Sequence, residues 1–323
     1  MMIVAALLTY ASALSYLGSR ALSRPWIYQR PGAGLLAWHV VVSTVMVSVV
    51  GAAFVASHDI WEPFATLVFR AEPESVHHQY VGSATVAHAW NGAVLVVGVL
   101  GLRLMFVAVK RRRRAAAARD DLRSAVRALN PRRLFSPTDD VVVVALREPT
   151  AFCVPGKAPM IVVSESALDV LSPQQLAAVV AHERAHLSHW HATGTAWATA
   201  VASTFPRWRL ARTYAAVVPL LHEMQADDIA AKANGGYAVV TSLVALSEMD
   251  AAGSLSMAGG HIRERGLRLL VPSPRQRGIV GLVGAGVAAL AMLPALLVVG
   301  PGLTVAGSDH HPELSHGEST PHH

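Results

Sequence analysis

The stretch Leu171–Trp190 reads LSPQQLAAVVAHERAHLSHW, and the helix that it predicts decides how the rest of the chain is interpreted. Ser172 is a favourable N-cap and Pro173 suits the first helical position. Gln175 completes a capping box immediately before an apolar run. The sequence therefore predicts a helix with a well-defined start, and any chemistry on it is held by a rigid element.

The second half of this helix carries an H-E-x-x-H pattern, formed by His182, Glu183 and His186. Residues at i and i+4 project from one face of a helix, so both imidazoles can bind a single Zn²⁺ ion. Glu183 is then placed to act as a base on a water at that ion. His189 and His191 follow closely, and we expect them to be solvated residues at the helix end, with a role as further ligands as the alternative.

A catalytic zinc ion usually has three protein ligands and one open position. The chain has one cysteine, Cys153, which excludes an intramolecular disulfide and makes a third histidine or a carboxylate the expected ligand. The candidates lie in AAVVPLLHEMQADDIAAKANGG, a helical pattern that starts at Ala215. We expect Glu223 to bind the metal and Asp227, one turn further, to accept the other ring N–H of a ligand histidine. A competing register uses His222 in place of Glu223.

The composition indicates a membrane protein. Hydrophobic residues make up 53% of the 323 residues and charged residues 15%, with a formal net charge of +6; soluble domains have roughly 25% charged residues. The basic excess lies beside apolar runs and lacks interleaved aromatic residues, so direct nucleic-acid binding is not expected. We predict four transmembrane helices, because a span needs roughly 20 apolar residues. They cover about residues 1–17, 35–56, 81–102 and 279–299.

The distribution of lysine and arginine predicts one orientation, because short cytoplasmic loops retain these residues. The basic run Lys110–Arg114 follows the third span, and Arg275 and Arg277 precede the fourth. Both termini are therefore expected outside. The predicted domains are three spans with short loops (1–109), a cytoplasmic domain (110–277), the fourth span (278–305) and an extracytoplasmic histidine-rich tail (306–323).

Histidines on the expected outer side suggest a different class of function. They are His58, His77, His78, His310, His311, His316, His322 and His323. Such a group can collect metal ions or gain charge below about pH 6.5. A non-catalytic metal or pH receptor is therefore one alternative, and a disordered, solvated tail is the simpler interpretation.

The chain resembles gluzincin-type membrane metallopeptidases. HERAH followed by E-x-x-A-D at residues 223–227 is similar to the motif pair shared by the HtpX and CAAX-prenyl-protease group and by the BlaR/MecR antirepressor peptidases. APMIVVSESALDVLSPQQLAAVVAHERAHL also resembles the strand, loop and active-site helix of that group. The likeness covers about residues 1–305 and is strongest over 155–231. In the BlaR/MecR type a cytoplasmic zinc domain lies between the third and fourth spans. We expect the penicillin-binding sensor domain of that type to be lacking here, so sensing of beta-lactams is not carried over.

The resemblance implies a mainly α-helical protein of the bacterial inner membrane, with an α+β zincin-like (gluzincin) domain between spans three and four. It implies a zinc endopeptidase with one Zn²⁺ per chain and a protein or peptide substrate. A regulatory enzyme that cleaves a cytoplasmic transcriptional repressor is the preferred function, and a quality-control protease of the HtpX kind is the runner-up. The residue that stabilises the transition state is left open among His261, Arg263 and Arg265.

The segment Pro159–Ser164, PMIVVS, predicts a strand just before the active-site helix. An extended substrate could pair along the free edge of such a strand. The alternative is an ordinary core strand. Within or near the spans, His39 and His88 are expected to make interhelical hydrogen bonds.

Overall fold

The computed structural model describes residues 2–57, 67, 84–134, 140–250, 258–271, 286 and 288–299 of the chain. The chain forms two compact units. The first comprises Met1–Ser15, Ser43–Val99 and Val287–His323, and the second comprises Tyr16–Val42 and Leu100–Gly286. The residues of the predicted catalytic site all lie in the second unit.

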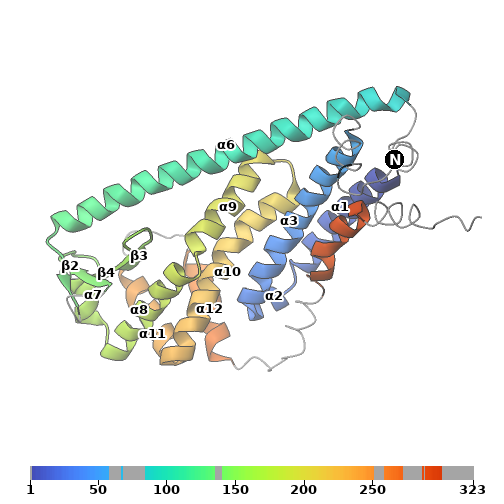
Figure 1. The fold of residues 1–323 in the computed structure, drawn as a ribbon. Helices are drawn as coiled ribbons and strands as arrows, with labels where there is room; N and C mark the ends of the chain where they lie inside the picture. The colour runs from blue at the N-terminus through green and yellow to red at the C-terminus, as the bar shows by residue number, and fades with distance from the viewer. Residues whose placement is uncertain are drawn as a thin grey trace, which may run out of the picture. The chain divides into compact units, whose positions relative to one another are not determined.

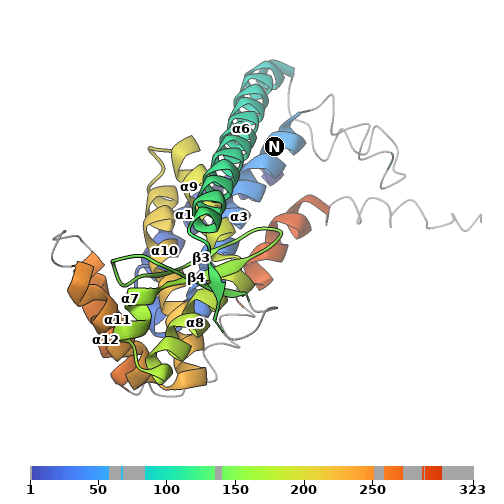
Figure 2. The same ribbon diagram turned by 90° about the vertical axis from the view of Figure 1, so that its left-hand side faces the viewer.

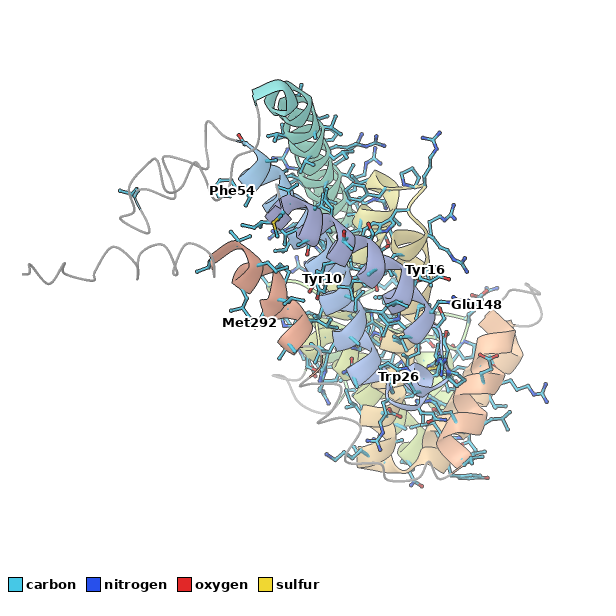
Figure 3. All side chains as sticks on the ribbon, turned by 90° about the vertical axis from the view of Figure 1, so that its right-hand side faces the viewer. Tyr10, Tyr16, Trp26, Phe54, Glu148 and Met292 are labelled. Carbon is cyan, nitrogen blue, oxygen red and sulfur yellow. The ribbon has the colours of Figure 1, made fainter. Side chains whose placement is uncertain are left out.

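Three helices in the described part of the chain are long and apolar enough to cross a membrane: Met2–Ala21 (α1), Pro31–Ala56 (α3) and Gly92–Ala128 within α6. They correspond to three of the four predicted spans. The fourth predicted span lies partly outside the described residues, although Ala288–Val299 is a short apolar helix. Figure 3 looks onto α1, where Tyr10 is labelled, and onto this short helix. The Tyr10 hydroxyl of α1 donates a hydrogen bond to the Leu290 carbonyl of the short helix at 2.9 Å.

Helix α6 spans Ala84–Ala128, well beyond the predicted end of the third span at residue 102. Its continuation is rich in alanine and arginine, which are good helix formers. The helix does not stop at the membrane boundary because nothing in this charged segment ends it. The far end of α6 is attached to the protein: Arg123 donates from Nη2 to the Ala158 carbonyl at 3.1 Å.

A small sheet follows α6 in the sequence. Its four strands are Arg132–Arg133 (β1), Val141–Val144 (β2), Ala151–Val154 (β3) and Met160–Ser164 (β4). They lie in the order β1-β2-β4-β3, with β2 parallel to β4 and β3 antiparallel to β4. The predicted strand at 159–164 is confirmed as β4. It lies between β2 and β3, however, so the expectation that substrate pairs along its free edge is wrong; the edge strand next to it is β3.

Most helices of the second unit follow the sheet in the sequence. One short helix, α2 (Trp26–Gln29), comes before the sheet. Figures 1 and 2 show α8 and α10 side by side, with β3 and β4 close to α8. The helix bounds are α7 Glu165–Val170, α8 Pro173–Ser188, α9 His191–Thr204, α10 Arg209–Asn234, α11 Gly236–Asp250 and α12 Ala258–Leu270.

The predicted start of the active-site helix is confirmed by its capping interactions. The Ser172 side chain accepts from the Gln175 N–H, and the Gln175 side chain accepts from the Ser172 N–H at 2.8 Å. Helix α8 ends at Ser188, and the chain turns at Trp190, whose φ of 56° places it in the left-handed region. A non-glycine residue there is strained, so the turn is held by its surroundings.

Apolar side chains cover both faces of the sheet. On one face Val141, Ile161 and Val163 pack with Val179 and Val180 of α8. On the other face the alternate β-strand residues pack against Val126, near the end of α6. Burial of each such side chain contributes roughly 1.5–3 kcal/mol. The active-site helix is therefore fixed to the sheet by its apolar face, which leaves its polar face for α10.

Candidate metal centre

Helices α8 and α10 bring together the three predicted ligands. One potential ligand atom from each of His182, His186 and Glu223 lies within 4.8 Å of the other two. The Nε2 atoms of the two histidines are 3.1 Å apart. The carboxylate oxygens of Glu223 lie 3.5 Å from each of them. Within the described residues this is the one group of three or more metal-binding side chains.

Asp227 lies behind His182, one helical turn from Glu223. Its Oδ1 atom is 3.1 Å from His182 Nδ1, and its side chain is fully buried. Burial lowers the pKa of His182, but contact with Asp227 and Glu223 outweighs it and raises the pKa to about 9. With Asp227 on the Nδ1 side, Nε2 of His182 is left to point at the centre.

His191 and Gln225 form the corresponding support behind His186. His191 Nδ1 is 3.0 Å from His186 Nδ1, and its Nε2 is 3.0 Å from the Gln225 amide oxygen. The amide oxygen can only accept, so His191 donates from Nε2. Burial lowers the pKa of both histidines, to about 4 for His186, so both rings are neutral. His191 Nδ1 therefore accepts from His186 Nδ1–H, which leaves Nε2 of His186 with a free lone pair.

His191 does not lie where the sequence predicted. Its side chain is only 3% exposed, whereas the neighbouring His189 is exposed as expected. The left-handed turn at Trp190 is the physical reason, because it interrupts the helix and returns the next residue toward His186. Spacing along a continuous helix does not indicate this contact.

These contacts fit a bound cation. With a pKa of about 9, His182 carries a proton on Nε2, which lies 3.1 Å from the Nε2 lone pair of His186 and 3.5 Å from the ionised Glu223 carboxylate. The centre thus already holds one positive charge among acceptors, and a metal cation can take the place of that proton. Two imidazole nitrogens and one carboxylate are a donor set that suits Zn²⁺.

Glu183 faces the edge strand β3. Its carboxylate is in hydrogen-bond contact with the thiol of Cys153. Burial is the main cause that raises the pKa of Glu183, and a carboxylate with a raised pKa is a stronger base. Burial and the Glu183 charge together raise the pKa of the Cys153 thiol to about 12, so that thiol stays protonated and donates to Glu183.

Arg265 of α12 is buried beside the two carboxylates of α10. It donates from Nε and Nη2 to both oxygens of Asp227, at 2.7 and 2.8 Å, and its Nη1 lies 3.1 Å from Glu223. Burial alone would raise the pKa of these carboxyl groups, but the guanidinium and His182 hold each pKa at about 2. The arginine thus keeps both carboxylates ionised and fixed in position.

The other residues considered from the sequence lie elsewhere. Arg263 is exposed on α12, and the side chain of His261 is outside the described residues. His222 is buried away from the three ligands: its Nδ1 is 3.0 Å from the Thr195 hydroxyl, and its ring stacks on that of His191. The outer histidines of the predicted sensor, and the side chain of His88, also fall outside the described residues.

A helix pair that presents two histidines and a glutamate to one point, with a further glutamate beside the first histidine, is a set of side chains that suits a zinc-dependent hydrolase. Residues 116–258 match the family model of Peptidase family M48, which consists of metallopeptidases that generally use zinc. This part of the chain is accordingly similar to an M48 peptidase domain. No curated protein and no solved structure matches the chain.

Proposed function

We propose that the protein is a zinc-dependent endopeptidase embedded in the inner membrane by four spans, with its catalytic domain in the cytoplasm. The observation that carries this proposal is the convergence of His182, His186 and Glu223 with their Nδ1 and carboxylate partners already in place. The three candidate spans support the membrane location. The lysine and arginine distribution supports the orientation.

In this proposal His182, His186 and Glu223 hold one Zn²⁺ ion, which supplies Lewis-acid activation of water and of the scissile carbonyl. Glu183 takes the proton from the attacking water and returns it to the leaving amine. Asp227 and His191 keep the two histidines in the tautomers that leave Nε2 free, and Arg265 holds Glu223 in place. The donors of Arg265 are directed at carboxylates, so we assign it a positioning role.

Strand β3 is the proposed substrate-binding edge. In an antiparallel pair, alternate residues direct their backbone groups to the neighbouring strand. Because the Ser164 N–H donates to the Thr150 carbonyl, Ala151 and Cys153 direct their backbone groups away from β4. The Glu183 carboxylate accepts from the Cys153 N–H, so the groups proposed for pairing are the N–H and C=O of Ala151 and the C=O of Cys153. An extended peptide can pair there, next to Glu183, with little dependence on its sequence.

The test is the variant Glu183→Gln, with Glu165→Gln as a matched control on the domain surface. Glu183→Gln should retain one zinc per chain, because it removes no ligand, and should lose peptide cleavage, because an amide takes no proton. Glu223→Ala should lose the zinc itself. Persistent cleavage by Glu183→Gln would refute the assigned base, and full zinc retention by Glu223→Ala would refute the ligand set.

We further propose that the substrate is a cytoplasmic protein such as a transcriptional repressor. This rests on the resemblance of the span arrangement to the BlaR/MecR type. Comparing the proteomes of cells that carry the wild-type chain and Glu183→Gln distinguishes two outcomes. One accumulating DNA-binding protein supports the regulatory function, whereas many accumulating unfolded membrane proteins support the quality-control alternative.

A further inference from the structure

The connection between α9 and α10 combines aromatic and basic side chains at the end of a helical hairpin. We call residues 205–212 the hairpin tip. The rings of Phe205 and Trp208 meet edge to face, with centroids 5.9 Å apart. Arg207, Arg209 and Arg212 are all exposed around them. Aromatic residues beside arginines are characteristic of a membrane interface.

The positive charge of the hairpin tip is not balanced within the described structure. Residues 205–212 contain no aspartate or glutamate. None of the salt bridges among the described residues involves Arg207, Arg209 or Arg212. Arg212 instead donates to the Pro206 carbonyl at 3.5 Å. Three exposed guanidinium groups that pair with no carboxylate of the described residues favour an anionic surface outside the chain.

A contact with α6 places the hairpin tip next to the basic run that follows the apolar part of α6. Arg111 donates from Nη2 to the Ser203 hydroxyl at 2.8 Å, in the last turn of α9. Arg111 belongs to the basic run Lys110–Arg114, which directly follows the apolar part of α6. The hairpin tip therefore lies beside the segment where α6 leaves the bilayer in the proposed topology. Figure 1 shows the end of α9 close to α6.

We propose that the hairpin tip binds the headgroups of anionic phospholipids in the cytoplasmic leaflet. The proposal rests on the membrane orientation given under Proposed function. The arginines and the basic run of α6 form one cationic surface, and each such residue near a bilayer surface is attracted to anionic lipid. The tip begins the same helix that carries Glu223, so the lipid contact holds the metal-binding face of α10 at a set distance from the bilayer.

The experiment uses the full chain in lipid nanodiscs, with a fluorophore on a cysteine at the hairpin tip, Pro206→Cys, in a Cys153→Ala background. Headgroup-labelled nitroxide lipids, either phosphatidylglycerol or phosphatidylcholine, are added at equal fractions as quenchers. We expect roughly threefold stronger quenching by the anionic lipid. The substitution of Arg207, Arg209 and Arg212 by glutamine should reduce it to the level of phosphatidylcholine, and so should high salt.

Matched controls separate the lipid surface from the topology. A triple glutamine substitution at the exposed Arg127, Arg133 and Arg147 should leave the quenching unchanged. A fluorophore at Lys232→Cys, at the other end of α10, should be quenched by neither lipid. A fluorophore at Met105→Cys, exposed on the apolar part of α6, should be quenched by nitroxide on the acyl chains.

The outcomes are distinguishable. Equal quenching by the two headgroups at position 206, or an anionic preference that survives the triple substitution, overturns the lipid surface while the catalytic proposal stands. Absence of acyl-chain quenching at position 105 overturns the membrane arrangement and the lipid surface with it. Zinc content and cleavage, measured on the chain and on its triple arginine variant with Cys153 intact and without a fluorophore, report separately on the active site.

Discussion

At the scale of single residues, the geometry of the metal centre depends on hydrogen bonds made behind the ligands. His186 can offer Nε2 to a metal because the Nδ1 atom of His191 accepts a hydrogen bond from the Nδ1–H of His186. Nδ1 of His191 is free to accept because the proton of that ring is on Nε2, which donates to the Gln225 amide oxygen. On the other side, the Asp227 carboxylate lies 3.1 Å from Nδ1 of His182 and stabilises a proton there electrostatically. Such outer partners fix ring orientation and raise the basicity of a ligand histidine.

The variant His191→Leu should weaken zinc binding about tenfold to a hundredfold, because the tautomer of His186 is no longer fixed. Zinc affinity can be measured by competition with a chelating dye. The exposed neighbour His189 provides the control, and His189→Leu should leave the affinity unchanged. Gln225→Leu alters the same chain of hydrogen bonds without touching a histidine, so unaltered affinity in both His191→Leu and Gln225→Leu would contradict the assignment.

The thiol of Cys153 should report the charge of Glu183. With a pKa of about 12 it stays protonated at neutral pH and forms thiolate only as the pH approaches that value. Alkylation by iodoacetamide at pH 8 should therefore be slow in the folded chain and fast after unfolding, because the thiolate is the nucleophile. The reaction is followed by intact mass.

Glu183→Gln removes the negative charge that, after burial, raises the thiol pKa most, so the midpoint of the pH dependence should move to lower pH. Burial remains and keeps the pKa above that of a free thiol. An identical profile in the wild-type chain and in Glu183→Gln would show that the two side chains do not interact.

Residue spacing explains what sequence alone reveals of this site. His182 and His186 are one turn apart on a capped helix, and Glu223 and Asp227 repeat that spacing on the next long helix, so the geometry of an α-helix predicts both pairs. His191 depends on the strained turn at Trp190, and Arg265 comes from a helix 38 residues after Asp227. Contacts of this kind depend on tertiary packing, which no local pattern describes.

At the scale of elements, α8 is stabilised at its first turn and along its apolar face. Ser172→Ala removes one half of the capping box and should lower the free energy of unfolding by about 1 kcal/mol. Thermal unfolding in detergent micelles measures the change. Ser188→Ala, at the other end of α8, is the control because its hydroxyl caps no N–H group and donates to the Ala185 carbonyl. Equal losses in the two variants would argue against the capping box.

The sheet shows where sequence patterns lose information. An apolar run such as PMIVVS predicts a strand, but not its neighbours, because both an edge and a central strand can be apolar. The structure places β4 between β2 and β3, where both sides of its backbone are paired. Only the shorter strand AFCV, which has no clear pattern of its own, has an open side next to Glu183.

At the scale of the whole molecule, the lysine and arginine distribution makes an orientation testable. A cysteine at Ser308 should react with an impermeant maleimide in intact cells, and a cysteine at Lys232 should react only after lysis, because the two are expected on opposite sides of the membrane. Gel-shift of the full chain measures both, with the reagent added before or after lysis. Labelling at position 232 in intact cells would place the catalytic domain outside.

Helix α6 has 45 residues and is therefore about 68 Å long. One end is apolar enough for a bilayer, and near the other end Arg123 grips the turn that joins β3 to β4. Because this hydrogen bond joins α6 to the β3–β4 turn, the cytoplasmic half of the helix and the peptide-pairing strand belong to one compact unit, in which the last turns of the helix help to fix the position of that strand.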